Sequence, residues 1–356
     1  MTSLQRFESV FSGEAISEIP VALCYEEIAI RDHFDDISDM PGEYFNDSDI
    51  EKRILWHKGV KKRLSHDWVR FPFAYCVEDE DEAKLQEKPV RGGQDFTEEW
   101  NEIQNKGNKI DSKEQIDRLV SVMEDGKETS GGPLTERLKT LYNDRPLTAL
   151  MSMPFWKCSY LWKFEDLMTM TLEAPALLEY AEKCFMDRSI KLLDHLGKQG
   201  VNMVWIEDCY TDMLSPQLFE RFNTVFAEGI INSIQSLGMK CVYYYTGNTD
   251  GKLDALLSLR ADAYAFEESK KTFDNDVTAL ARKIKGESVL VGNIDSIGVL
   301  QDGDMQSIRQ EIRRQVEAGR RNEGRFVVGL GSPITPDTPT DKIIEFIKIA
   351  REETIL

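Results

Sequence analysis

Two adjacent carboxylates at the end of an apolar run are the residues of this chain best suited to acid–base chemistry. Residues 201–210, VNMVWIEDCY, have a β-branched and aromatic bias and contain Glu207 and Asp208 near their end. Such a run predicts a buried parallel strand that presents its last side chains at its C-terminal end. Glu207 and Asp208 are therefore the first catalytic candidates.

Strand geometry limits what these two acids can do together. Successive side chains point to opposite faces of a strand, so at most one of Glu207 and Asp208 faces a common site. The alternative, that both cap helices or form ion pairs, stays open. Glu267 follows a later apolar run and is a third catalytic candidate.

Tyr245 is the fourth catalytic candidate. It closes the run KCVYYY, and a tyrosine hydroxyl can donate to a developing negative charge or to a substrate oxygen. The alternative for the three consecutive tyrosines is ring packing on both faces of a strand.

Eight apolar runs must position these residues, and helical patterns separate them. The runs cover residues 19–25, 67–76, 147–155, 201–210, 240–245, 261–266, 288–294 and 325–330. Strands that alternate with helices predict an α/β fold, a single (β/α)8 TIM barrel over residues 1–356. Pro175 divides residues 164–196 into two helices, and Ser215 with Pro216 starts a helix that runs to Leu237.

Residues 77–145 are rich in charged residues and glycine, with helical spacing around 112–124. They predict a long helical excursion between the second and third strands. The excursion is either a solvated insertion or a lid over the strand ends.

The active site of such a barrel lies where the strands end, which defines the candidates for substrate contact. They are Tyr25, Glu26, Trp156, Tyr244, Asn248, Glu268, Asn293, Asp295 and Ser332. For Glu26, Glu268, Asn293, Asp295 and Ser332 the alternative is helix capping or turn chemistry. Histidine is missing from these positions, which argues against a histidine-based triad.

Composition excludes several classes of partner. The chain has 44 basic and 63 acidic residues, and its net charge of -19 repels nucleic acid and anionic lipid surfaces. Six cysteines are spread without a CxxC pair, and neither a signal segment nor a membrane-spanning apolar run is present. We therefore expect a cytoplasmic protein that binds neither nucleic acid nor membrane.

The C-terminal half resembles the uroporphyrinogen decarboxylase superfamily. The resemblance covers about residues 164–355. It rests on GNID at 292–295, the helix RQEIRRQVEAG, the stretch GLGSPITPDTPTDKIIEFI, the segment LSPQLFERF after Asp208 and the turn YYYTGN. The resemblance implies a barrel that acts either as a decarboxylase of a porphyrin precursor or as a methyltransferase that works with a corrinoid protein.

The motifs of both branches are altered here. The RQAGR turn of the decarboxylases, which grips substrate carboxylates, is replaced by CYEEIAIRDHF, in which Arg31 is the only arginine. This exchange argues against a polycarboxylate ligand. The histidine that the decarboxylases carry after the last strand is Ser332.

The zinc motif of the thiol methyltransferases is also altered. Its HxCG positions hold Tyr244, Tyr245, Thr246 and Gly247, and its last cysteine is again Ser332. We therefore expect no zinc site of this type and assign no metal ligands. A carboxylate-rich variant built from Glu207, Glu267 or Cys209 stays open.

The sequence thus favours an enzyme that transfers a methyl group from a small methylated substrate to a corrinoid protein. Glu207 or Glu267 would be the acid that protonates the leaving heteroatom, and Tyr245 would orient the substrate. The alternatives are a decarboxylase of a tetrapyrrole or other carboxylate, and a barrel that binds a ligand without chemistry.

Overall fold

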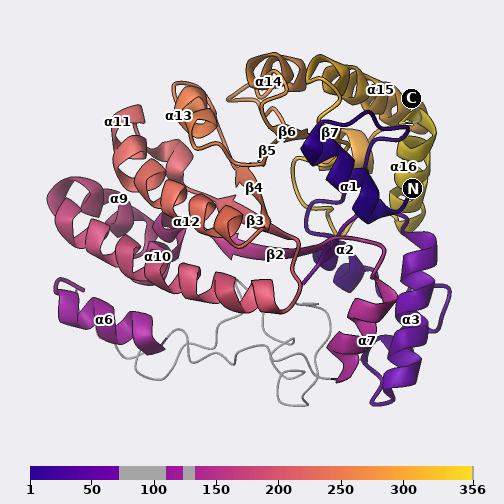
Figure 1. The fold of residues 1–356 in the computed structure, drawn as a ribbon, viewed down its shortest axis with the longest axis horizontal. Helices are drawn as coiled ribbons and strands as arrows, with labels where there is room; N and C mark the ends of the chain where they lie inside the picture. The colour runs from indigo at the N-terminus through magenta and orange to yellow at the C-terminus, as the bar shows by residue number, and fades with distance from the viewer. Residues whose placement is uncertain (72–109, 123–132, 355–356) are drawn as a thin grey trace.

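The computed structural model describes residues 1–71, 110–122 and 133–354 (Figure 1). In these residues, seven strands form one parallel sheet in chain order, β1 to β7, and each strand pairs with the next. The strands are β1 (Val69–Arg70), β2 (Leu147–Ser152), β3 (Met203–Asp208), β4 (Lys240–Tyr245), β5 (Ala263–Phe266), β6 (Val289–Val291) and β7 (Phe326–Val327). Figure 1 shows the sheet curled, with helices around its outside. The α/β class is as predicted.

The helices alternate with these strands. Before β2 lie α1 (Ser3–Ser12), α2 (Glu26–Asp32), α3 (Ile50–Arg63), α6 (Lys113–Val122) and α7 (Pro133–Leu141), with a 3-10 turn at Gly42–Asn46. Between β2 and β4 lie α8 (Pro154–Lys157), α9 (Phe164–Glu173), α10 (Pro175–Lys198), α11 (Pro216–Phe219) and α12 (Val225–Ser236), with 3-10 turns at Cys158–Tyr160 and Thr211–Met213. After β4 lie α13 (Leu253–Ser258), α14 (Val277–Ile284), α15 (Met305–Arg321) and α16 (Thr340–Glu353).

The predicted helix boundaries agree well with the structure. The break at Pro175 separates α9 from α10. The Ser215 side chain accepts the N–H of Leu218, as expected of an N-cap. The helix then continues through a π-helical turn at Glu220–Thr224 and ends at Ser236, one residue before the predicted end.

The first predicted strand, residues 19–25, does not form. Val21 makes only an isolated parallel bridge to Val328. The Ala22 N–H donates to the Val328 carbonyl at 2.8 Å, and the Val21 carbonyl accepts the Asp67 N–H at 2.7 Å. Pro20 has no N–H to extend this ladder, so the segment stays a short link between β7 and the residues before β1.

Other predicted strands are longer than those observed. Only β4 has the predicted bounds. The second predicted strand is reduced to β1, and its residues 72–76 lie outside the described part of the chain. Of the predicted excursion at 77–145, the structure describes α6, α7 and their flanks, so the lid remains a prediction. In the described residues, no helix combines the length and the apolar character that a membrane crossing requires.

Helix α1 covers the amino ends of the strands. The Leu4 N–H donates to the carbonyl of Asp144, which precedes β2. Arg325, which precedes β7, donates from Nη1 to the carbonyl of Phe11 at 2.7 Å. The opposite, carboxyl ends of the strands are therefore the end left for a site.

A buried carboxylate fixes this closed end. Asp67 is fully buried and accepts the N–H of Val21 at 2.7 Å and the hydroxyl of Ser3 at 2.6 Å. It also pairs with Arg6 and Arg351, each at 2.7 Å, so it joins the first and last helices. Burial pushes the pKa of Asp67 up, but Arg351 and Arg6 together hold it below its usual value.

We expect Asp67→Asn to lower the free energy of unfolding by about 3 kcal/mol, because two arginines lose a buried partner. The control, Glu345→Gln, breaks an exposed pair with Lys348 and should cost less than about 1 kcal/mol. A depressed native pKa gives stability that is lost as the pH falls through it, so the variant should also lose less stability on acidification. Urea unfolding at neutral and acidic pH measures both effects. Equal losses in the two variants would contradict the role of Asp67.

Candidate active site

Glu207 is the centre of a hydrogen-bonded group on the inner face of the sheet. It lies at the end of β3, and its Oε1 accepts the hydroxyl of Tyr25 at 2.6 Å. Its Oε2 accepts the hydroxyl of Ser152, from the end of β2, at 3.4 Å. Burial raises the pKa of Glu207, although the two hydroxyls oppose this shift. Glu207 therefore keeps its proton to a higher pH than an ordinary glutamate, which suits a proton donor.

Aromatic rings surround this carboxyl. The Tyr25 ring meets Trp205 and Tyr244 edge to face, with centroids 6.0 and 6.1 Å apart. The rings of Trp205 and Tyr244 lie 4.8 Å apart. The Tyr244 hydroxyl donates to the carbonyl of Gly331 at 2.7 Å. Glu207 thus has apolar walls and few polar neighbours, which explains its desolvation.

Asp208 lies on the opposite face of β3, as alternation requires. It is fully buried and accepts from Thr211 at 2.8 Å, Asn223 at 2.6 Å and Tyr243 at 2.8 Å. Burial raises the pKa of Asp208 to about 7 against the effect of these donors. Tyr245 shares this outer face, where its hydroxyl donates to the Asn248 carbonyl at 3.2 Å. The structure does not bring Asp208 and Tyr245 together with Glu207.

A second polar group lies at the ends of β5 and β7. Glu268 is buried, and its carboxylate accepts the Ser332 hydroxyl at 2.6 Å and the Lys270 ammonium. Glu267 accepts the N–H of Gly247 at 2.9 Å and pairs with Lys270 at 3.5 Å. Both glutamates thus share one lysine, which the sequence patterns did not single out.

The remaining predicted contacts have local structural partners. The Asn248 side chain accepts the N–H of Asp250 at 3.0 Å. Asn293 donates to the Asn275 carbonyl at 2.7 Å. The Asp295 side chain caps the π-helical turn Ser296–Gln301 by accepting two N–H groups at 2.9 Å. For Asn293 and Asp295 these bonds match the turn-chemistry alternative, and substrate contact by all three residues remains a prediction.

Trp156 lies in α8, half-buried, with its ring 5.9 Å from that of Tyr160. Burial raises the pKa of Tyr160, and the nearby charge of Glu207 adds to this shift. Trp156 therefore lies near the Glu207 region through Tyr160, and its contact with substrate is also a prediction.

Sequence reasoning missed Arg70, a buried arginine at the end of β1. Its guanidinium carbon lies 5.3 Å from the centroid of the Tyr25 ring, and its Nε lies 3.2 Å from Oε1 of Glu27. The backbone N–H of Arg70 donates to the carboxyl of Glu26. Burial and the charge of Glu27 raise the pKa of Glu26 to about 8, against the effect of Arg70. An arginine between Val69 and Phe71, inside an apolar run, was the available signal.

The positions of the zinc motif do not fit a thiolate zinc site. The Tyr244 and Ser332 hydroxyls donate to Gly331 and Glu268, and the motif has no sulfur or imidazole ligand. In the described ranges, no cluster of three or more His, Cys, Asp or Glu side chains is arranged to hold a metal ion. A zinc site of the thiolate type therefore does not fit the residues present.

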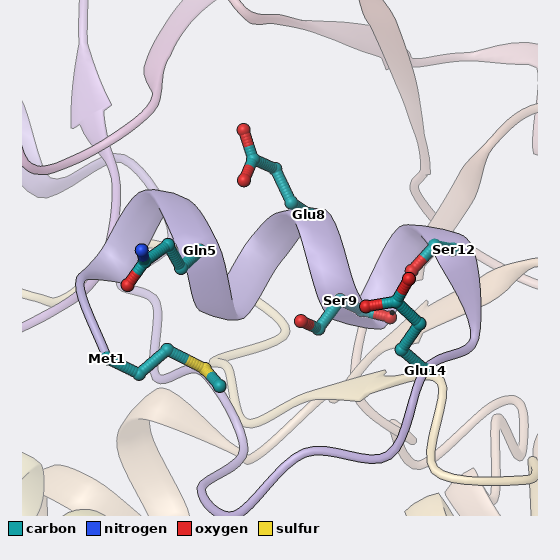
Figure 2. Close-up of a pocket in the computed structure, with 6 residues that line it drawn as sticks. All are labelled: Met1, Gln5, Glu8, Ser9, Ser12 and Glu14. Atoms are coloured by element: carbon teal, nitrogen blue, oxygen red, sulfur yellow. Dashed lines mark hydrogen bonds between the residues drawn. The ribbon is translucent and has the colours of Figure 1, made fainter.

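A hollow elsewhere on the surface is not part of this site. Figure 2 shows it along α1, where it is lined by Met1, Gln5, Glu8, Ser9, Ser12 and Glu14. Because α1 covers the amino ends of the strands, this hollow lies at the end away from Glu207.

Asp208 predicts a pH dependence of stability. Its native pKa of about 7 exceeds the usual value near 4, so the stability it contributes below about pH 4 is lost as the pH rises towards 7. Asp208→Asn removes this titration. Between pH 5 and 8, we expect the variant to gain roughly 1–3 kcal/mol relative to the wild type in urea unfolding. If the free energies of unfolding of the two proteins change equally with pH, Asp208 has an ordinary pKa.

Comparisons with known proteins agree with the predicted family. Residues 95–353 match the profile of the family described as Uroporphyrinogen decarboxylase (URO-D). The chloroplastic uroporphyrinogen decarboxylase of Nicotiana tabacum is 23% identical over 229 residues, which cover 62% of this chain and 56% of that protein. The methylcobamide:CoM methyltransferase MtbA of Methanosarcina mazei is 21% identical over 188 residues, 52% of each chain. The chain thus spans about half the length of these relatives.

A solved structure extends the likeness to the whole chain. A methyltransferase from Methanosarcina mazei superposes with a TM-score of 0.63 over 99% of both chains at 18% identity. At this identity the comparison shows a shared fold. The profile match covers most of the chain, and the chain therefore belongs to the uroporphyrinogen decarboxylase family.

Proposed function

We propose that the protein is an enzyme that transfers a methyl group from a small methylated substrate to a corrinoid protein, with Glu207 as the acid. The observation that carries the proposal is the carboxyl of Glu207, half-buried on the inner face of the sheet among aromatic rings and bonded to Tyr25. Because burial raises its pKa, this carboxyl is a better proton donor to a leaving oxygen or nitrogen than an ordinary glutamate.

The reaction balances with the corrinoid as the second substrate. The bond between the methyl carbon and the heteroatom breaks, and its electron pair stays on the heteroatom. That atom takes the proton of Glu207. The reduced cobalt of the partner's corrinoid supplies the electron pair that binds the methyl group. Glu207 recovers its proton from solvent.

The neighbouring residues have separate roles in this proposal. Tyr25 orients Glu207, and the Trp205 and Tyr244 rings exclude water from the methyl group. Glu268 and Ser332 bound the proposed site at the ends of β5 and β7. Asp208 and Tyr245 support the ends of β3 and β4 from behind and do not touch substrate.

The relatives support methyl transfer without deciding it. One is named a methylcobamide:CoM methyltransferase, so cobamide-linked methyl transfer occurs among proteins similar to this chain. The fold neighbour is also a methyltransferase.

We further propose that the bridge between Val21 and Val328 closes the curled seven-stranded sheet into a barrel. The described cysteines are free of disulfides, which supports a reducing cytoplasmic location.

A decarboxylase is the second candidate, and Arg70 is the observation that favours it. A buried guanidinium near Glu207 could hold a carboxylate of the substrate. Only this arginine adjoins the group around Glu207 in the described residues, whereas a polycarboxylate needs several cations. Release of CO2 from uroporphyrinogen without methyl transfer would establish this candidate instead.

Glu207→Gln should lower the rate of methyl transfer by about 10²–10⁴-fold, because glutamine keeps the shape but cannot give a proton. The assay mixes the protein with reduced free cobalamin and a panel of methoxylated and methylaminated compounds. It follows methylcobalamin by absorbance and the demethylated product by mass spectrometry. Glu228→Gln, on the exposed face of α12, is the matched control. Undiminished transfer in the Glu207 variant would refute the acid role, and transfer by no panel member in the wild type would refute the proposed function.

Tyr25→Phe should move the pH profile of the same reaction. The Tyr25 hydroxyl lowers the pKa of Glu207, so its loss raises that pKa and extends activity to higher pH. The alkaline limb of the rate should shift upward by about one pH unit, a change typical of one lost charge-assisted hydrogen bond. Tyr180→Phe, whose hydroxyl binds Asp117 outside the sheet, should leave the limb in place. A limb unmoved by Tyr25→Phe would mean that another group sets it.

A further inference from the structure

We propose that Arg70 and Glu27 form a subsite for an α-hydroxy or α-amino carboxylic acid. In this subsite Arg70 takes the carboxylate and Glu27 takes the hydroxyl or amino group on the adjacent carbon. The inference deepens the proposed function, on which it rests for the statement that the ligand is the substrate. It assigns the chemical class of that substrate from a pair of side chains that the acid mechanism does not use.

Arg70 has unused hydrogen-bonding capacity. Its side chain is 5% exposed, yet in the described part of the chain neither Nε nor Nη1 has a hydrogen-bond partner. Among the described residues its one ion pair is with Glu27, at 3.2 Å from Nε, and this contact lacks hydrogen-bond geometry. A guanidinium is a planar fork that prefers two parallel bonds to one carboxylate. Arg70 therefore lacks the partner that its shape favours.

Within the part of the chain that the structure describes, Glu27 has an unpaired acceptor that complements the unpaired donors of Arg70. Its Oε1 faces Arg70, and its Oε2 is buried without a hydrogen-bond partner among the described residues. Buried polar atoms are almost always paired, so open atoms on both members of one ion pair point to a missing group. That group must accept from Arg70 and donate to Glu27. A carboxylate with a donor on the next carbon satisfies both requirements.

The charges around the pair fit such a ligand. Glu26 adjoins Arg70, but burial and the charge of Glu27 raise its pKa, which reduces its negative charge near neutral pH. Lys270 is already engaged by Glu267 and Glu268. Arg70 and Glu27 therefore balance each other, and a zwitterion or a singly charged hydroxy acid adds at most one negative charge. A ligand with several carboxylates meets no further cation here.

The Tyr25 ring places the subsite beside the proposed acid. The Arg70 guanidinium lies 5.3 Å from the centroid of this ring, and the hydroxyl of the same ring lies 2.6 Å from Glu207. A ligand anchored at Arg70 and extended along the ring would reach Glu207 with its far end. The methylated heteroatom therefore belongs at the end of the molecule away from the carboxylate.

Three probes with the same carbon skeleton test the subsite by isothermal titration of the full-length protein. Propionate carries the carboxylate alone, lactate adds a hydroxyl, and alanine adds an ammonium group. We expect lactate and alanine to bind the wild type about 10-fold or more tighter than propionate, the usual effect of one hydrogen bond to a charged group. Equal affinities of the three probes, or no binding of any, would overturn the proposal.

Variants separate the two halves of the subsite. Arg70→Lys should weaken all three probes by at least about 10-fold, because an ammonium cannot form two parallel bonds. Arg31→Lys, which changes an exposed arginine on α2, is the matched control and should change none. Because a buried arginine also affects folding, Glu27→Gln gives an independent test: it should remove most of the advantage of alanine and keep the binding of propionate. An unchanged advantage in Glu27→Gln, or equal effects of the two arginine variants, would refute the subsite.

These experiments distinguish a failure of the subsite from a failure of the proposed reaction. The titrations need neither corrinoid nor a methyl group, so probe binding without methyl transfer would leave the subsite and remove the proposed reaction. Methyl transfer from the panel with no selectivity among the probes would keep the reaction and remove the subsite.

Discussion

The alternation of side chains along β3 is the constraint on which the rest of the site depends. Glu207 and Asp208 are neighbours in the chain, but the strand sends one to the inner face and the other to the layer between sheet and helices. Glu207, on the inner face, contacts hydroxyl groups and aromatic rings. Asp208, on the outer face, accepts hydrogen bonds from three donors in the buried layer between sheet and helices. Burial raises the pKa of both acids, so a raised pKa does not distinguish them. Their roles differ because Glu207 lies on the inner face of the sheet and Asp208 on the outer face.

The outer layer holds the inner one in register. Asp208 accepts from Tyr243 on β4 and from Asn223 in the π-helical turn, so a single carboxylate joins two strands to the helix that covers them. In the same pairing, Glu207 lies opposite Tyr244 and Asp208 lies opposite Tyr245. A shift of one residue between β3 and β4 would turn Tyr244 outward and remove the ring that lies against Trp205. The buried acid that does no chemistry in our proposal thus preserves the geometry of the acid that does.

Local patterns predicted the elements well and the contacts between them poorly. The bounds of β4 and the break at Pro175 follow from residue type alone, because strand propensity and a missing N–H act locally. The segment at 19–25 has an equally apolar sequence but forms only one bridge, because its pairing depends on β7 and on Pro20. The partner of Glu207 is Tyr25, 182 residues away, a contact that no spacing rule contains. The sequence patterns did not single out Arg70, because a charged residue within an apolar run usually marks the end of a strand. Only the fold shows which side chains surround it.

The position of Arg70 also changes how the altered family motif is understood. The turn that carries arginines in the decarboxylases carries Glu26 and Glu27 here, yet a positive charge persists on the adjacent strand β1. A buried ion pair with open polar atoms does little for stability, since the desolvation of both groups offsets their attraction. The fold would lose little if apolar residues filled this space. A pair that stabilises the protein so weakly, placed against the ring that binds the proposed acid, is best explained by a ligand that completes its hydrogen bonds.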